Sequence, residues 1–120
     1  MPTERAWRLL RPCCFALALL AVAGHFSFGA TPAAVGLLAP PLDKAAHMLY
    51  FGALAALLSA GWRGTRPLAA FLVACCVGAA DEVFQMFLPG RHPDGADLAA
   101  GMAGALVGAF AVRQLFAGKP

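Results

Sequence analysis

The sequence predicts an all-α fold: an integral membrane bundle of four transmembrane helices, forming a single domain over residues 1–120. Three observations predict it, namely a very apolar composition, long apolar blocks, and short breaks rich in Pro and Gly. Hydrophobic residues make up 61% of the chain and charged residues only 12%, about half the charged fraction of an average soluble domain. The apolar residues arrive in blocks long enough to cross a bilayer.

The breaks between the blocks predict the helix boundaries. The first block follows three arginines and is about 20 residues long, which favours an uncleaved span over the shorter apolar region of a signal peptide. Pro and Gly clusters separate the later blocks, because such clusters do not continue a helix. We expect helices at about residues 9–28, 43–60, 68–87 and 94–116.

Basic residues are distributed unevenly between the two ends of this bundle. One end would hold only Lys44 and Arg91, and the other would hold Arg5, Arg8, Arg11, Arg63, Arg66, Arg113 and Lys119. Cytoplasmic segments of membrane proteins are enriched in Lys and Arg, so both termini should be cytoplasmic. The net charge of +3 is no argument for a nucleic-acid partner, because the basic residues stand singly between apolar blocks.

Acidic residues show the opposite distribution. Glu4 alone lies at the expected cytoplasmic end, whereas the outer interface collects Asp43, Asp81, Glu82, Asp94 and Asp97. Three segments meet there: the starts of the second and fourth helices and the end of the third. At the start of the second helix, Asp43 and His47 are i, i+4 neighbours and share a helix face.

Glu82 is the most demanding of these acids, because it lies five residues before the expected end of its helix. That spacing places it roughly 7–8 Å below the end. A charge at such depth needs a partner or a wet cavity, and Lys44 or Arg91 could supply the partner. We expect one polar site at the outer face, composed of Asp43, Lys44, His47, Glu82, Gln85, Arg91, Asp94 and Asp97.

Several interpretations of this site remain open. It could be a static network of ion pairs and hydrogen bonds, with Asp43 and Asp94 as helix N-caps. It could instead bind a divalent cation, either Mg²⁺ or Ca²⁺ joining the carboxylates to a lipid phosphate or zinc held by His47 and carboxylates. A carboxylate could also act as a general acid with His47 as the base. Arg91 could clamp a phosphate or carboxylate, or form a salt bridge with a nearby acid.

The fourth expected helix carries a line of small residues, Ala100, Gly104 and Gly108. Small residues allow helices in lipid to approach closely. The line predicts close packing, either within the bundle or between two copies of the chain in a homo-oligomer.

Three motifs in this order resemble the VanZ-like family of small membrane proteins. A D-K-x-x-H motif is matched by Asp43, Lys44 and His47. An E-x-x-Q motif before a P-G-R turn is matched by Glu82, Gln85, Pro89, Gly90 and Arg91. A D-x-x-D motif before a small-residue helix is matched by Asp94, Asp97, Ala100 and Gly104. One departure is Gly101, which stands where the family usually has Asn.

The resemblance implies a multi-pass protein of the bacterial cell (inner) membrane with a role in the cell envelope. The family is linked to resistance to glycopeptide antibiotics, notably teicoplanin, which act outside the membrane on cell-wall precursors. We therefore expect the outer face to bind or modify an envelope lipid or a lipid-linked cell-wall precursor. The alternative is a non-enzymatic scaffold or partner subunit in the membrane. The sequence names no reaction.

Overall fold

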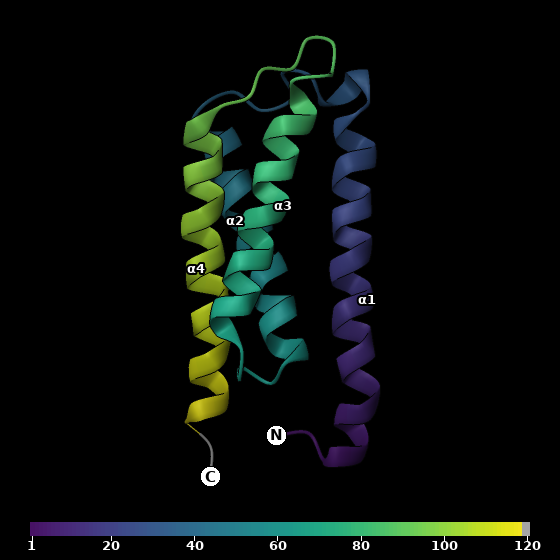
Figure 1. Cartoon of the computed structure of the whole chain (residues 1–120), viewed down its shortest axis with the longest axis vertical. Helices are drawn as coiled ribbons and strands as arrows, with labels where there is room; N and C mark the ends of the chain where they lie inside the picture. Colours follow the sequence, from purple (N-terminus) through teal and green to yellow (C-terminus); the bar gives the residue numbers. More distant parts are fainter. Residues whose placement is uncertain (119–120) are drawn as a thin grey trace.

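The computed structural model describes residues 1–118 and confirms an all-α fold (Figure 1). Its four long helices are α1 (Glu4–Gly29), α2 (Leu42–Gly61), α3 (Pro67–Gln85) and α4 (Gly95–Ala117), with a short 3₁₀ helix, η1 (Pro32–Ala34), between α1 and α2. The long helices run up and down along one axis. The N-terminus and the C-terminal end of α4 therefore lie at the same end of the bundle. We call the opposite end, which holds the α1–α2 and α3–α4 connections, the distal end.

Three of the four helices are clear candidates for membrane spans. Within the described residues, α1, α3 and α4 are long and apolar enough to cross a bilayer. Helix α2 has 20 residues, about 30 Å at 1.5 Å per residue, which also matches the hydrocarbon core. It is less apolar because Asp43, Lys44 and His47 occupy its first two turns.

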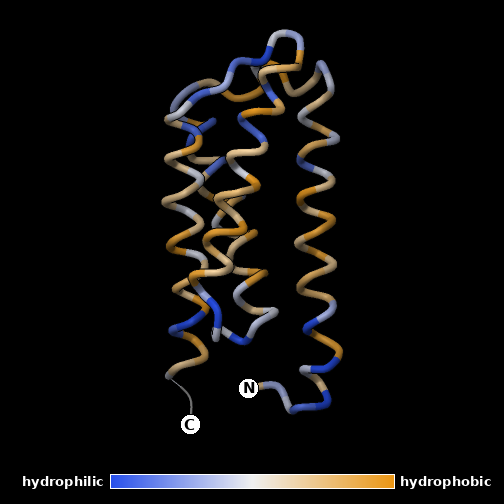
Figure 2. The backbone as a smooth tube through the Cα atoms, in the orientation of Figure 1, coloured by the Kyte–Doolittle hydropathy of each residue, from blue (hydrophilic) through white to orange (hydrophobic). Residues whose placement is uncertain are grey.

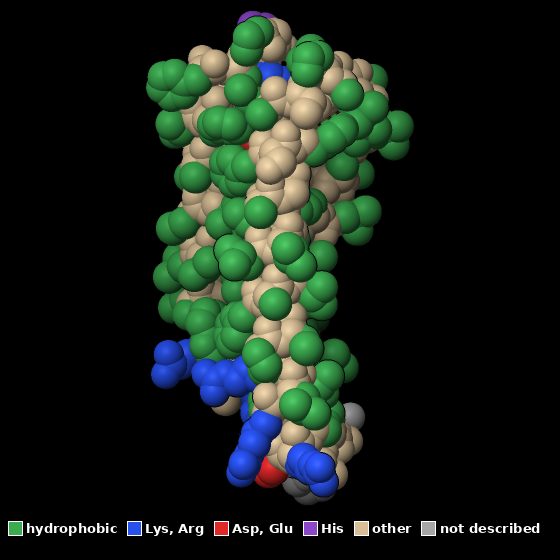
Figure 3. All heavy atoms as spheres, turned by 90° about the vertical axis from the view of Figure 1, so that its right-hand side faces the viewer, with side chains coloured by type: hydrophobic (Ala, Val, Ile, Leu, Met, Phe, Trp, Pro, Cys, Tyr) green, Lys and Arg blue, Asp and Glu red, His purple; other side chains and the backbone are tan. Residues whose placement is uncertain are grey.

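The polar residues of the bundle collect at its two ends (Figure 2). On the face shown in Figure 3, hydrophobic side chains cover the length of the molecule, and Lys and Arg gather at the end that holds the N-terminus. Large apolar side chains such as Leu19, Leu49 and Val107 are exposed on the helices. An apolar belt between two polar ends is the surface that a bilayer requires.

Two helix boundaries differ from the prediction. Helix α1 begins at Glu4 rather than near Leu9, because the Thr3 hydroxyl caps it by accepting a hydrogen bond from the Ala6 N–H at 3.2 Å. Helix α3 ends at Gln85 rather than Phe87. Glu82 therefore lies three residues from the helix end, roughly 4.5 Å below it, and not the greater depth predicted.

The two predicted N-caps have different outcomes. Asp94 caps α4, because its Oδ1 accepts a hydrogen bond from the Ala96 N–H at 2.8 Å. Asp43 is not a cap, and that interpretation was wrong. Helix α2 already begins at Leu42, and the Asp43 carboxylate accepts instead from the N–H of Lys44 at 2.9 Å.

Helix α2 is at the centre of the packing. It contacts all three other long helices, and its contact with α4 is the most extensive in the bundle. Helix α1 packs mainly on α2, and it reaches α4 near the N-terminal end, where the rings of Trp7 and Phe116 have centroids 5.5 Å apart. The core that joins these helices consists of Ala18, Phe51, Leu54, Ala55, Leu58, Ala70, Ala74, Ala105 and Ala109.

Glycine makes the α2–α4 contact possible. A Cβ on Gly104 would overlap the carbonyl oxygen of Met48, and a Cβ on Gly108 would overlap that of Gly52. A Cβ on Gly52 would in turn lie 3.0 Å from the carbonyl oxygen of Gly104. Two members of the predicted small-residue line are thus used for packing within the chain.

Replacing Gly104 or Gly108 with Ala should destabilise the bundle, because α2 and α4 must separate to admit the new methyl group. Overpacking of this kind costs about 1–3 kcal/mol. Thermal unfolding in detergent would measure the loss. The matched control is Gly24→Ala on α1, where nothing lies within 4 Å of the added Cβ. Equal unfolding midpoints for all three variants would contradict the packing described here.

Candidate functional site

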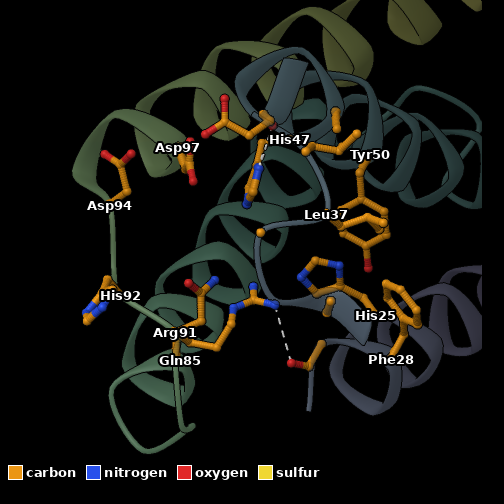
Figure 4. Close-up of a pocket in the computed structure, with 17 residues that line it drawn as sticks. His25, Phe28, Leu37, His47, Tyr50, Gln85, Arg91, His92, Asp94 and Asp97 are labelled. Atoms are coloured by element: carbon orange, nitrogen blue, oxygen red, sulfur yellow. Dashed lines mark hydrogen bonds between the residues drawn. The ribbon is translucent and has the colours of Figure 1, made fainter. Parts of the chain in front are cut away.

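All eight predicted site residues lie at the distal end of the bundle. Six of them line a cavity of about 460 Å³, namely Asp43, His47, Gln85, Arg91, Asp94 and Asp97 (Figure 4). Lys44 lies among the acids beside this cavity, and Glu82 borders a second, smaller one. The larger cavity is within the size range of small-molecule sites. Its other walls come from the end of α1 and from the α1–α2 connection.

Lys44 holds together the start of α2 and the start of α4. Its Nζ lies 3.1 Å from one carboxylate oxygen of each of Asp43, Asp94 and Asp97. These three acids could by their spacing hold a metal ion, but the ammonium group of Lys44 already contacts all three. The ion pairs that the sequence suggested are therefore present in this part of the site.

The backbone of α4 contributes to the same arrangement. The Ala96 N–H, and then the Lys44 ammonium, hold the pKa of the Asp94 carboxyl below its ordinary value of 3.8. Stabilisation from this carboxylate is present above that ordinary value and is lost as the pH falls through the lower, folded-state pKa. Asp94 therefore remains charged and bound to Lys44 at neutral pH.

Glu82 is not neutralised as predicted. Its Oε2 accepts a hydrogen bond from the N–H of Asp94 at 2.7 Å, which ties the end of α3 to the start of α4. Over residues 1–118 no Lys or Arg forms an ion pair with it. The ion pair of Glu82 with Lys44 or Arg91 that the sequence suggested is therefore not formed among these residues.

Arg91 is the cation of the distal end that has no carboxylate partner among the described residues. Its guanidinium points into the cavity and donates one long hydrogen bond, 3.4 Å, to the carbonyl oxygen of Gly29 (Figure 4). The salt bridge to Asp94, Asp97 or Glu82 that the sequence allowed is not formed. This guanidinium retains most of its donors for a ligand.

His47 faces the cavity from α2. Its Nδ1 lies 2.8 Å from the carbonyl oxygen of Asp43. A carbonyl oxygen only accepts, so Nδ1 carries the hydrogen, and in the neutral ring Nε2 carries the lone pair. The Nε2 atom is buried and has no hydrogen-bond partner among residues 1–118.

The predicted site omitted three residues that the structure adds. Asp81 is 4% exposed, and its Oδ2 lies 3.0 Å from Nε2 of His25 and 3.1 Å from the Gln85 amide nitrogen. The His25 ring stacks on Tyr50, with ring centroids 4.5 Å apart. Asp81 had a sequence signal, an acid in an apolar helix spaced i, i+4 from Gln85. His25 had no such sequence signal, because α1 is distant in sequence from Asp81.

Gly101 packs against the ring of Phe51. A Cβ at this position would lie 2.8 Å from Cδ2 of Phe51. An Asn, which the family usually has here, would require that ring to move. The departure from the family motif is therefore accommodated by an aromatic side chain, and no amide group is supplied at this point.

Replacing Lys44 with Met should destabilise the distal end, because three carboxylates would then face one another without a cation. The unfolding midpoint in detergent at pH 7 should fall further than it does for Asp94→Asn. The deficit should shrink below about pH 4, where carboxyl groups protonate, and should be partly restored by adding Asp97→Asn. Arg66→Met, at the exposed opposite end, is the control. A Lys44→Met midpoint equal to wild type would refute this role.

Comparison with known proteins identifies the family of the chain. The family model described as VanZ/LLP1 matches residues 7–117, a range that includes all four long helices except the first residues of α1 and holds every residue of the site. No curated protein and no solved structure matches the chain. The extent of the family match shows that the chain belongs to the VanZ/LLP1 family.

Proposed function

We propose that this chain binds an envelope lipid, or a lipid-linked cell-wall precursor, through an anionic phosphate headgroup in the distal cavity. The observation that carries the proposal is the guanidinium of Arg91, which enters the cavity without a carboxylate partner among the described residues. Arg is well suited to phosphate because its planar fork makes paired, charge-assisted hydrogen bonds. His25 and His92 also line the cavity and can donate hydrogen bonds.

The cavity also has an apolar side that suits a lipid. Phe28, Leu37 and Leu38 line it, from the end of α1 and the connection to α2. A ligand there can place a phosphate near Arg91 and an acyl or prenyl chain against these residues. Three acids that line the cavity, Asp43, Asp94 and Asp97, share the ammonium group of Lys44, which offsets one of their three negative charges. The attraction for a phosphate must therefore come from the guanidinium of Arg91.

The orientation we propose places this cavity in the outer leaflet. The end opposite the cavity holds Arg5, Arg8, Arg11, Arg63, Arg66 and Arg113, while Lys119 lies outside the described residues. By the positive-inside rule this end is cytoplasmic. Helix α2 then crosses the membrane as the fourth span, with its polar first turns at the outer interface. The protein is accordingly a multi-pass protein of the bacterial inner membrane with both termini in the cytoplasm.

A protein so placed meets lipid-linked cell-wall precursors where they are exposed outside the membrane. Binding or altering such a precursor would connect this chain to the glycopeptide and teicoplanin resistance associated with the family. The alternative function is a scaffold that docks through the small-residue face of α4. It has less support, because Gly104 and Gly108 contact α2 within the chain.

Replacing Arg91 with Ala should remove the selectivity for a phosphate headgroup. Native mass spectrometry of the purified protein, with polyprenyl phosphate and the uncharged polyprenol as competing ligands, measures it directly. Wild type should prefer the phosphate, and Arg91→Ala should reduce that preference about tenfold or more, the effect of losing a charge-assisted hydrogen bond. Arg91→Lys should retain part of it.

The matched control is Arg66→Ala, which removes an exposed arginine at the opposite end. Its lipid preference should equal that of wild type. The proposal fails if wild type binds phosphate and polyprenol equally, or if Arg91→Ala keeps the full preference. Because Arg91 makes one long hydrogen bond within the chain, the variant should fold and allow a clean comparison.

A further inference from the structure

We propose that His47, Asp81 and Glu82 form a binding site for one divalent transition-metal ion of the Zn²⁺ or Mn²⁺ class, below the lipid-sized cavity. His47 comes from α2, and the two acids are consecutive residues of α3. One potential ligand atom from each lies within 4.8 Å of the other two. Ligand atoms bound at about 2.0–2.2 Å lie roughly 3–4 Å apart, so small side-chain rotations would close the site.

The orientation of His47 is the first independent support. Its Nδ1–H donates to the carbonyl oxygen of Asp43 at 2.8 Å, which fixes the ring and leaves the lone pair of the neutral imidazole on Nε2. That Nε2 atom is buried and has no hydrogen-bond partner among the described residues. A histidine that binds a metal typically donates its other ring N–H to a carbonyl or carboxylate in this way.

The local charge is the second support. Asp81 is almost fully buried, and its contacts are His25 and Gln85. Glu82, its neighbour, has no cationic partner in residues 1–118. Lys44 binds three other acids, and Arg91 binds none. Two adjacent carboxylates inside an apolar bundle need compensating charge, and a divalent ion would supply it.

The available space is the third support. A small cavity of about 10 Å³ is bordered by His47, Asp81 and Glu82, with Gly101 and Phe51 completing part of its wall. This volume is close to the minimum that holds a single water molecule. It excludes a lipid headgroup and fits one ion or one water.

The donor set indicates the class of metal. One imidazole and two carboxylates suit Zn²⁺ or Mn²⁺, whereas Ca²⁺ and Mg²⁺ prefer oxygen ligands alone. The other acidic cluster at the distal end, Asp43, Asp94 and Asp97, has oxygen ligands only, but Lys44 occupies its centre. The site with the unpartnered nitrogen is therefore the better metal site.

The test is metal binding by the full-length protein purified in detergent and stripped with a chelator. Titration with Mn²⁺ followed by electron paramagnetic resonance, and with Zn²⁺ against a competing dye, should each give one bound ion per chain. His47→Gln and Glu82→Gln should each weaken binding about a hundredfold. Glu4→Gln, which removes an exposed acid at the opposite end of the bundle, is the control and should keep wild-type affinity.

Thermal unfolding keeps the test decisive if a variant folds poorly. Stoichiometric Zn²⁺ or Mn²⁺ should raise the unfolding midpoint of wild type and of Glu4→Gln, whereas Mg²⁺ at the same concentration should not. Absence of a stoichiometric ion in wild type, or unchanged affinity in both His47→Gln and Glu82→Gln, would overturn the proposal. No lipid enters these measurements, so their outcome is independent of the proposed lipid-binding function.

Discussion

The close contact between α2 and α4 is the constraint on which the rest of the structure depends. In lipid, helices gain little from the hydrophobic effect, and they associate through tight packing and interhelical hydrogen bonds. Gly104 and Gly108 remove the side chains that would hold the two backbones apart. Once this register is set, Ser59 of α2 donates to the carbonyl oxygen of Ala109 at 2.9 Å. At the distal end, Lys44 reaches Asp97. The same register places the ring of Phe51 over Gly101.

Lys44 and Arg91, the Lys and Arg residues of the distal end, differ in their contacts. The ammonium group of Lys44 already contacts three carboxylates within the chain. Arg91 lies in the connection between α3 and α4, where no described acid pairs with it, and its guanidinium enters the cavity. One cation therefore stabilises the end of the bundle and the other remains available to a ligand.

Much of the helical arrangement, and the residues that gather at the distal end, could be predicted from the sequence, because the dominant signals are local. Apolar blocks separated by Pro and Gly give the four helices, and alternating direction brings the starts of α2 and α4 and the end of α3 to one end. The pairing of side chains could not be predicted. Whether Lys44 contacts Glu82 or Asp97 depends on the register of α2 against α4. His25 reaches Asp81 from a helix more than fifty residues away in sequence. The early start of α1 followed from a Thr3 cap that lies outside the apolar block.

The central claim is the proposed orientation, in which the polar site faces the outside of the cell, at the end away from the N-terminus and from the C-terminal end of α4. Labelling with a membrane-impermeant maleimide in spheroplasts tests it most directly, using a chain in which Cys13, Cys14, Cys75 and Cys76 are replaced by Ala. His92→Cys reports the distal end, and Thr65→Cys reports the α2–α3 turn at the opposite end. Both positions are exposed. The account predicts that His92→Cys is labelled in intact spheroplasts and Thr65→Cys only after permeabilisation. The reverse pattern, or equal labelling of both, would contradict it.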